Sequence, residues 1–197
     1  MKTGKIILAM SVFAVLWAIV PAMADDKKNS NVGLKLNLGL GSQDVPSSLD
    51  LENGGAASLS LGYGVSQSVT LWLGMNGSNH IHELDKDRES KIVGVELGAQ
   101  YKFRRHEKFR PYGKLNLGTY FFGTEDGTGR VLNGGGVAWA LGAEYRLTSF
   151  FSVGAEFYWK DFDYTKQSFE GTDGDYTDLP DPITGNTKGI MINFTLH

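Results

Sequence analysis

The sequence contains no cysteine, no excess of basic residues and no long hydrophobic stretch beyond its first two dozen residues. The absence of cysteine excludes disulfide staples and thiolate metal sites. With 19 basic and 22 acidic residues, the chain has no basic footprint for nucleic acid. After the amino-terminal segment, no apolar run approaches the roughly 20 residues of a spanning helix. If the rest of the chain lies in a membrane, it must therefore cross as strands of a closed barrel.

The first 24 residues have the pattern of an export signal. A basic start at Lys2 and Lys5 precedes the apolar run Ile6–Val20, and a small-x-small sequence ends at Ala24. We predict cleavage between Ala24 and Asp25, with an uncleaved anchor helix as the alternative. Cleavage would remove two lysines and leave 17 basic against 22 acidic residues, a net charge of −5. The mature 173 residues suit one domain, residues 25–197.

A two-residue periodicity is present instead, and it is clearest between Val137 and Lys160. Alternate residues form one apolar face and one face of small and charged residues. Because successive side chains of a strand point to opposite sides, this stretch is predicted to be a two-faced β-hairpin. Each arm has about 10 residues, the length that a tilted strand needs to cross the hydrocarbon layer. The apolar face comprises Val137, Trp139, Leu141, Ala143, Tyr145, Leu147, Phe151, Val153, Ala155, Phe157 and Trp159.

The same alternation recurs in six further segments. With the hairpin they make eight strands, an even number, which predicts an all-β fold: an antiparallel up-and-down transmembrane β-barrel. The six segments are 33–40, 57–65, 69–76, 93–103, 114–121 and 189–196.

The connections between these strands alternate in length. Short turns on the periplasmic side and long loops outside are typical of outer-membrane barrels, so we expect both termini in the periplasm. The short or modest connections are 66–68, 104–110 and 148–150, and the predicted long surface loops are 43–53, 77–90, 123–135 and 161–187.

The polar faces are crowded with glycine, which decides the orientation. A soluble barrel would turn its apolar face inward, but a water-exposed face has no need of so little side chain, whereas a narrow lumen does. Aromatic residues near the strand ends also fit two interfacial belts. The predicted inward glycines are Gly33, Gly39, Gly62, Gly64, Gly74, Gly94, Gly98, Gly118, Gly142 and Gly154.

Two stretches carry a family resemblance. The segment Phe109–Gly118 resembles a central strand of the OmpA-type barrel family, and Gly142–Glu156 resembles the hairpin that follows it. The resemblance implies a monomer in the outer membrane, in contact with lipid and lipopolysaccharide, delivered by periplasmic chaperones and the barrel-assembly machinery. It implies the barrel domain alone, without a peptidoglycan-binding domain. The family's assembly signal usually ends in an aromatic residue, whereas this chain ends in His197, so we expect Phe194 to replace it.

Eight charged residues lie on the faces predicted to line the lumen. We expect Arg146, with Lys114 or Lys102, to neutralise Glu144 and Glu156. A gate or ion path is one interpretation. A salt-bridged plug is favoured, because lumens of eight strands are normally filled and the inward residues Trp72, Tyr120 and Tyr158 are bulky. The predicted charge network comprises Lys35, Glu96, Lys102, Lys114, Glu144, Arg146, Glu156 and Lys160.

Two loop motifs suggest chemistry only weakly. Ser78, His80 and His82, in the second long loop, could form a metal pair or part of a hydrolase, but no third partner is identifiable. The acidic last loop contains Asp173-Gly174-Asp175, which lacks the spacing and terminal glutamate of a calcium loop. A solvated loop is expected there, with divalent ions bridging it to lipopolysaccharide as the alternative.

We therefore predict no catalytic residues, no cofactor and no metal site. The expected role is structural: stabilising the outer membrane and presenting surface loops. A narrow conduit for small or apolar solutes is the second hypothesis, and a lipid A-modifying enzyme that uses His80 is the third.

Overall fold

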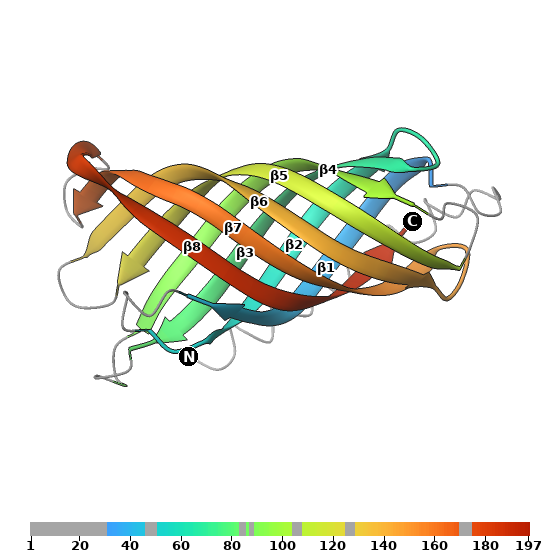
Figure 1. Ribbon diagram of the computed structural model, residues 1–197, viewed down its shortest axis with the longest axis horizontal. Coiled ribbons are helices and arrows are strands. Elements are labelled where there is room, and N and C mark those ends of the chain that lie inside the picture. Colours follow the sequence, from blue (N-terminus) through green and yellow to red (C-terminus); the bar gives the residue numbers. More distant parts are fainter. Residues whose placement is uncertain are drawn as a thin grey trace, which may run out of the picture.

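The computed structural model describes residues 31–45, 51–82, 86, 89–103, 108–124, 129–169 and 175–197. In it, eight antiparallel strands form a closed barrel in which each strand pairs with its neighbour in sequence and the last pairs with the first (Figure 1). The predicted fold class is confirmed. The predicted export signal and its cleavage site lie outside the described residues. The strands are β1 (Gly33–Asp44), β2 (Gly54–Gly64), β3 (Val69–Ile81), β4 (Glu89–Lys102), β5 (Phe109–Thr124), β6 (Arg130–Arg146), β7 (Phe151–Phe169) and β8 (Thr177–Leu196).

The two ends of the barrel differ. At one end, which we call the short-turn end, tight turns follow β2 and β6. There the Val65 and Leu147 amides donate to the carbonyls of Val69 and Phe151, both at 3.0 Å. The opposite end, the long-hairpin end, carries the extended β7–β8 hairpin, orange and red in Figure 1. No helix in the described part of the chain is long and apolar enough to cross a bilayer.

The outside of the barrel is apolar and the inside is polar. Leu97 and Leu117 are 63% and 65% exposed, whereas Lys102 and Arg110 are 0% and 1% exposed. Outward leucines lie side by side in register around the wall, as at the pair Leu73 and Leu97. This arrangement inverts that of a soluble protein, in which apolar side chains fill the interior. The predicted orientation of the two faces is therefore observed, and the outer surface suits hydrocarbon.

Most of the predicted inward glycines make room for bulky neighbours. A Cβ at Gly62 would collide with the Trp72 ring, and one at Gly98 would collide with the Asn116 side chain. Gly33 is an exception, because a Cβ there would meet nothing. The backbone at Gly33 has a φ of +120°, a conformation that glycine adopts readily and other residues rarely do. Gly64 and Gly154 lie against backbone atoms of Asn31 and Ala143, and the other seven leave space for side chains of the lumen.

The strands at the long-hairpin end are longer than the sequence analysis predicted, and the predicted loops are correspondingly shorter. The prediction of a loop over 161–187 was wrong for most of that segment, since β7 continues to Phe169 and β8 begins at Thr177. The reason is that the alternation reverses in polarity: Phe162 is buried and points inward, while Asp161 is exposed. Beyond a membrane the outer face meets water, so this reversal is expected. The predicted loops 43–53, 77–90 and 123–135 are shortened in the same way.

The reversed segment has an apolar core of its own. Rings of Tyr120 and Phe162 lie 4.8 Å apart, and those of Phe162 and Tyr164 lie 5.1 Å apart. Leu132 joins this cluster, with Phe122, Leu179 and Ile183 packed against it. The register shifts between Tyr164 and Lys166, opposite a stretch of β8 that contains two prolines. Because proline has no amide hydrogen to donate, the irregularity falls where pairing is interrupted. The base of the β7–β8 hairpin is therefore held by this apolar cluster.

The exposed leucines give a direct test of the orientation. Replacing Leu97→Arg at the middle of the outer wall should cost about 2–4 kcal/mol of unfolding free energy in a bilayer, because the charge would lie in hydrocarbon. Ser42→Arg, near the rim of the same face, should cost about 0–1 kcal/mol. Urea unfolding in liposomes would measure both. Equal costs at the two depths would contradict the assigned orientation.

Candidate functional site: the polar lumen

Two groups of polar side chains occupy the lumen. The first, which we call the short-turn cluster, lies at the short-turn end and consists of Asn31, Lys35, Lys102, Arg110, Glu144, Arg146 and His197. The second, the central cluster, lies deeper in the barrel and consists of Asn76, Glu96, Asn116, Tyr120 and Lys160.

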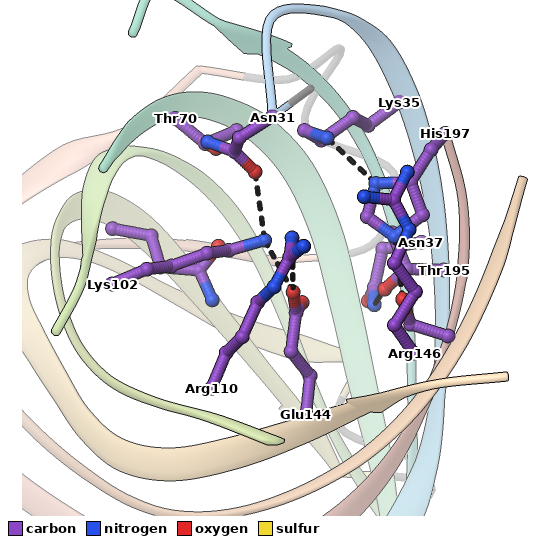
Figure 2. Close-up of polar contacts among 12 residues, drawn as sticks. Asn31, Lys35, Asn37, Thr70, Lys102, Arg110, Glu144, Arg146, Thr195 and His197 are labelled. Carbon is purple, nitrogen blue, oxygen red and sulfur yellow. Dashed lines mark hydrogen bonds and ion pairs between the residues drawn. The ribbon is translucent and has the colours of Figure 1, made fainter. Parts of the chain in front are cut away.

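Glu144 is the carboxylate on which the short-turn cluster converges (Figure 2). Its Oε1 lies 2.7 Å from Lys102 Nζ and 3.7 Å from Arg110 Nη1. Lys102 also donates to Asn31 Oδ1 at 2.9 Å, and the Asn31 amide nitrogen donates to Thr70 Oγ1 at 3.0 Å. Strands β3, β4, β5 and β6 are thus joined across the lumen by one chain of contacts, and the prediction that Lys102 neutralises Glu144 agrees with this geometry.

His197 closes the other side of the short-turn cluster (Figure 2). Lys35 Nζ lies 2.7 Å from its Nδ1, and Ser152 Oγ lies 2.6 Å from its Nε2. An ammonium group can only donate, so Nδ1 accepts and Nε2–H donates to the serine. Burial, together with the positive charges led by Lys35, lowers the pKa of the His197 imidazole well below its usual range. The ring is therefore neutral and links β1 to β7.

Among the described residues, Arg146 forms no ion pair with a carboxylate within 4.0 Å, and its hydrogen bonds go to the turn after β6 instead. Its Nε donates to the Thr148 carbonyl at 3.1 Å and its Nη2 to the Ser149 carbonyl at 2.5 Å. The two carbonyls of the tight turn after β6 point toward Arg146. The planar guanidinium can donate to both of them at once. Arg146 thus stabilises the turn, and its Nη1 is buried with no hydrogen-bond acceptor within the described residues.

Glu96 is the centre of the second cluster and accepts from four side chains. Lys160 Nζ lies 2.9 Å away and Asn76 Nδ2 lies 2.8 Å away. Asn116 Nδ2 donates at 2.7 Å and the Tyr120 hydroxyl at 3.0 Å. Lys160 also donates to Asn76 Oδ1 at 2.6 Å. A buried ion pair is stable only when further hydrogen bonds satisfy its remaining atoms, and this one meets that condition.

Glu156 and Lys114 lie between the clusters. Glu156 accepts from the Tyr112 hydroxyl at 2.8 Å and forms no ion pair among the described residues. Lys114 is half-buried and lines two small cavities, with no carboxylate within 4.0 Å in the described part of the chain. Lys114 is therefore near Glu156, as both line the same two cavities, but the two form no direct ion pair. Register explains the separation, since Gly142 faces Glu156 across the hairpin and Ala140 faces Lys114.

Sequence reasoning missed Arg110 and the inward role of His197. Arg110 had been placed in the turn 104–110, whereas it lies in β5 and is fully buried. The signal was available, because Arg110 continues the inward series of Tyr112 and Lys114 by one step of two residues. His197 was expected only at a barrel end, but it lies inside the short-turn end, where its ring contacts Lys35 and Ser152.

Side chains of the described residues occupy much of the lumen. Two cavities between them measure about 40 and 20 Å³. A water molecule needs roughly 10–15 Å³ by this kind of measure, so each cavity holds a few waters at most. Trp72 lines both cavities, and its indole nitrogen donates to Gln100 at 2.9 Å. The predicted bulky inward residues Trp72, Tyr120 and Tyr158 are all buried.

The predicted loop residues Ser78 and His80 lie in β3, so their placement in a loop was wrong. His80 is fully buried, with its Nε2 2.9 Å from Ser78 Oγ and its Nδ1 3.1 Å from the Glu52 carbonyl oxygen. His82 follows the strand and its Nε2 lies 3.0 Å from Ser90 Oγ. These contacts tie the start of β2 and β4 to β3. Among the described residues, no three His, Asp or Glu side chains gather as a metal site.

An apolar outer wall, a hydrogen-bonded polar lumen and a closed ring of eight strands define an integral membrane β-barrel. The chain belongs to the outer membrane protein beta-barrel domain family, whose model matches residues 8–182. It is therefore a protein of the outer membrane. No curated protein matches the sequence.

Solved structures share this fold. Neisserial surface protein A is similar with a TM-score of 0.64 at 12% identity, over 86% of this chain and 99% of that one. The outer membrane protein OprG from Pseudomonas aeruginosa is similar with a TM-score of 0.54 at 17% identity, over 84% of this chain and 95% of that one. At these identities the likeness establishes the fold.

Glu144 should contribute more to stability than Glu156, although both are buried carboxylates of the same hairpin. Glu144→Gln would leave Lys102 and Arg110 facing a neutral amide, at an expected cost of about 3–5 kcal/mol. Glu156→Gln keeps an acceptor for Tyr112 and should cost about 1 kcal/mol. Urea unfolding in micelles, followed by tryptophan fluorescence, would compare the variants. Similar costs for both would contradict the central role of Glu144.

The neutral state of His197 can be observed directly. The ring nitrogens should show an Nε2–H tautomer by NMR that does not protonate between about pH 7 and 5, where a histidine of ordinary pKa would. Because protons would then bind only the unfolded chain, stability should fall as the pH drops below about 6.5. Lys35→Met should raise the pKa of His197, since it removes a nearby positive charge. Titration of His197 near its ordinary value would contradict the assignment.

Proposed function

We propose that this protein is a closed-lumen barrel whose role is structural and surface-interactive, with neither transport nor catalysis. The observation that carries the proposal is Glu96, which is held by four donors from β3, β5 and β7. Such a cluster spans the lumen and fixes the strands relative to one another. We further propose that the protein is a monomer in contact with outer-membrane lipid and lipopolysaccharide, assembled through periplasmic chaperones and the barrel-assembly machinery.

A conduit is less well supported. Opening a path past the central cluster would break the 2.9 Å pair of Glu96 and Lys160 and expose both charges in a narrow space. Removing one partner of such a pair costs about 3–5 kcal/mol. The short-turn cluster would present a second barrier of the same kind.

An enzyme centred on His80 is also less well supported. The Ser78–His80 contact has the distance of a nucleophile–base pair, and the Glu52 carbonyl orients the ring. However, Ser78 is 5% exposed and His80 is 0% exposed, so a substrate carbonyl has no approach to the hydroxyl. The arrangement serves to join strands.

The surface role would belong to the β7–β8 hairpin. The base of this hairpin packs on the apolar core around Phe162. Its outer face is polar; for example, the Thr184 hydroxyl donates to Asp163 Oδ1 at 2.8 Å. The base of the hairpin consists of paired strands with fixed positions, and the exposed Tyr176 and Asp178 lie near its tip. A partner would meet ordered strands there, above the membrane.

Three measurements separate the candidate functions. In planar bilayers, wild type and Glu144→Gln should both lack discrete conductance steps, because the central cluster still closes the lumen. Cells with and without His80→Ala should carry lipid A of the same mass. Loss of the protein should sensitise cells to detergent, and the wild-type chain should restore resistance.

Stable conductance steps that change in Glu144→Gln would favour the conduit. A change in lipid A mass that depends on His80 would favour the enzyme. Either result would refute the proposal.

A further inference from the structure

A cavity of about 360 Å³ lies on the outer wall toward the long-hairpin end of the barrel. It lies where β1 ends: the pairing of β1 with β8 stops at Asp44 and Lys188, whereas β8 extends back to Thr177. Small-molecule sites measure about 300–1,000 Å³, so this cavity has the size for an organic ligand. The two cavities of the lumen, of about 40 and 20 Å³, are too small for one.

Two tryptophans form one side of the cavity. Trp139 on β6 pairs in register with Trp159 on β7, and both line the cavity. Their ring centroids lie 4.1 Å apart with an interplanar angle of 13°, and Trp139 is 41% exposed. The face of an aromatic ring is electrostatically negative, and tryptophan attracts cations more strongly than tyrosine or phenylalanine does. This side of the cavity is therefore both apolar and favourable to positive charge.

The charged residues of the lining sum to a net negative charge. Two carboxylates, Asp44 and Asp161, are opposed by one ammonium, that of Lys188. In the register, Lys188 faces Asp44 on β1 and Trp159 on β7. Asp161 faces the neutral Asn186 one outward row further. Among the described residues, none of the three charged groups forms an ion pair within 4.0 Å. The cavity thus contains one carboxylate more than Lys188 can neutralise.

The level of the cavity in the wall strengthens the effect of this charge. Toward the short-turn end, the next outward residues are Phe157 on β7 and Ile190 on β8, which are paired and exposed. In the other direction lie Asp161 and Asn186, which are exposed and polar. The cavity therefore lies at the boundary between hydrocarbon and water, with its polar side toward water. Charges beside hydrocarbon interact through a lower dielectric than charges in bulk water, so a cation is attracted more strongly here than on a soluble surface.

We propose that this cavity binds a water-soluble organic ammonium ion. The carboxylates of Asp44 and Asp161 neutralise its positive charge, and the indole rings contact its alkyl or aryl groups. A phosphate or another anion does not fit, because the carboxylates outnumber the ammonium. A bare divalent ion fits poorly, because calcium takes six to eight oxygen ligands and would leave the aromatic side unused. The polar side faces water, so the ligand enters from the medium.

This inference goes beyond the proposed function, which names no small ligand, and it rests on the same orientation in the membrane. The probe is benzyltrimethylammonium, whose charge does not depend on pH, titrated into the full barrel in non-ionic micelles that contain no ammonium headgroups. NMR of the indole N–H groups reports binding. We expect saturable shifts of the Trp139 and Trp159 signals. The signal of Trp72, which is buried in the lumen, should stay in place and serves as the internal reference.

Variants with opposite expected effects locate the site. Asp161→Asn and Trp159→Leu should each weaken binding of the probe by about tenfold, which corresponds to about 1.4 kcal/mol. Lys188→Gln should instead tighten binding by about threefold, because it removes the ammonium that competes for the two carboxylates. An anionic ligand would show the reverse response to these charge changes.

Glu89→Gln is the matched control. Glu89 is an exposed carboxylate of β4 at the same end of the barrel, and it does not line the cavity. Its replacement should leave the affinity for the probe unchanged. Each variant is first checked for a heat-modifiable shift in gel mobility, which reports a folded barrel.

The possible failures are distinguishable. If neutral benzyl alcohol shifts the two indole signals as the ammonium probe does, or if Asp161→Asn and Lys188→Gln bind as wild type does, the cavity is not a cation site, although the proposed function stands. Displacement of the probe by magnesium at constant ionic strength, or by phosphatidylethanolamine added to the micelles, would assign the cavity to a metal or a lipid and would also overturn the inference. If the wild-type protein shows no heat-modifiable mobility and remains in the soluble fraction, the orientation itself fails, and the proposed function fails with it.

Discussion

The structure depends on one constraint: within hydrocarbon, every backbone amide and carbonyl must find a partner in the protein. A single sheet can meet this only by closing on itself, and here the closure is the pairing of β1 with β8, from Leu36 opposite Leu196 to Asp44 opposite Lys188. Closure with eight strands makes the lumen narrow. The inward glycines follow from that narrowness, since Gly62 must admit the ring of Trp72. The apolar outer wall follows from the solvent, which is lipid.

The interior is where folding costs the most free energy, because charged side chains are buried there. Within the described residues of the short-turn cluster, the cations Lys35, Lys102, Arg110 and Arg146 are all buried beside one carboxylate, Glu144. The structure distributes the charges among acceptors of different kinds: the carboxylate, the neutral ring of His197 and the turn carbonyls beside Arg146. Each of these contacts joins different strands or ties a strand to its turn. We infer that the network specifies register more than it adds stability, in keeping with the modest net value of buried ion pairs.

The sequence was informative wherever the membrane imposes a pattern. Inside the hydrocarbon each strand must alternate, so the inward placement of Lys102 and Glu144 could be predicted and is observed. Beyond it the alternation reverses, so the strand containing Phe162 was mistaken for a loop. Only some of the contacts between side chains across the lumen could be predicted from the sequence. Lys102 and Glu144 could be paired because both are inward, but whether Arg146 meets a carboxylate or a turn carbonyl depends on the three-dimensional path of the turn. No pattern in the sequence encodes that path.

The central claim is that the odd-numbered side chains of β4 face lipid and the even-numbered ones face a filled lumen. Because the chain contains no cysteine, single cysteines can be introduced from Val93 to Lys102 and labelled with a nitroxide in liposomes. Accessibility to oxygen should oscillate with a period of two, with maxima at Val93, Val95, Leu97, Ala99 and Tyr101 and little access of a water-soluble nickel complex at those positions. Maxima at the even-numbered positions, or contact of the odd-numbered ones with the nickel complex, would contradict the account.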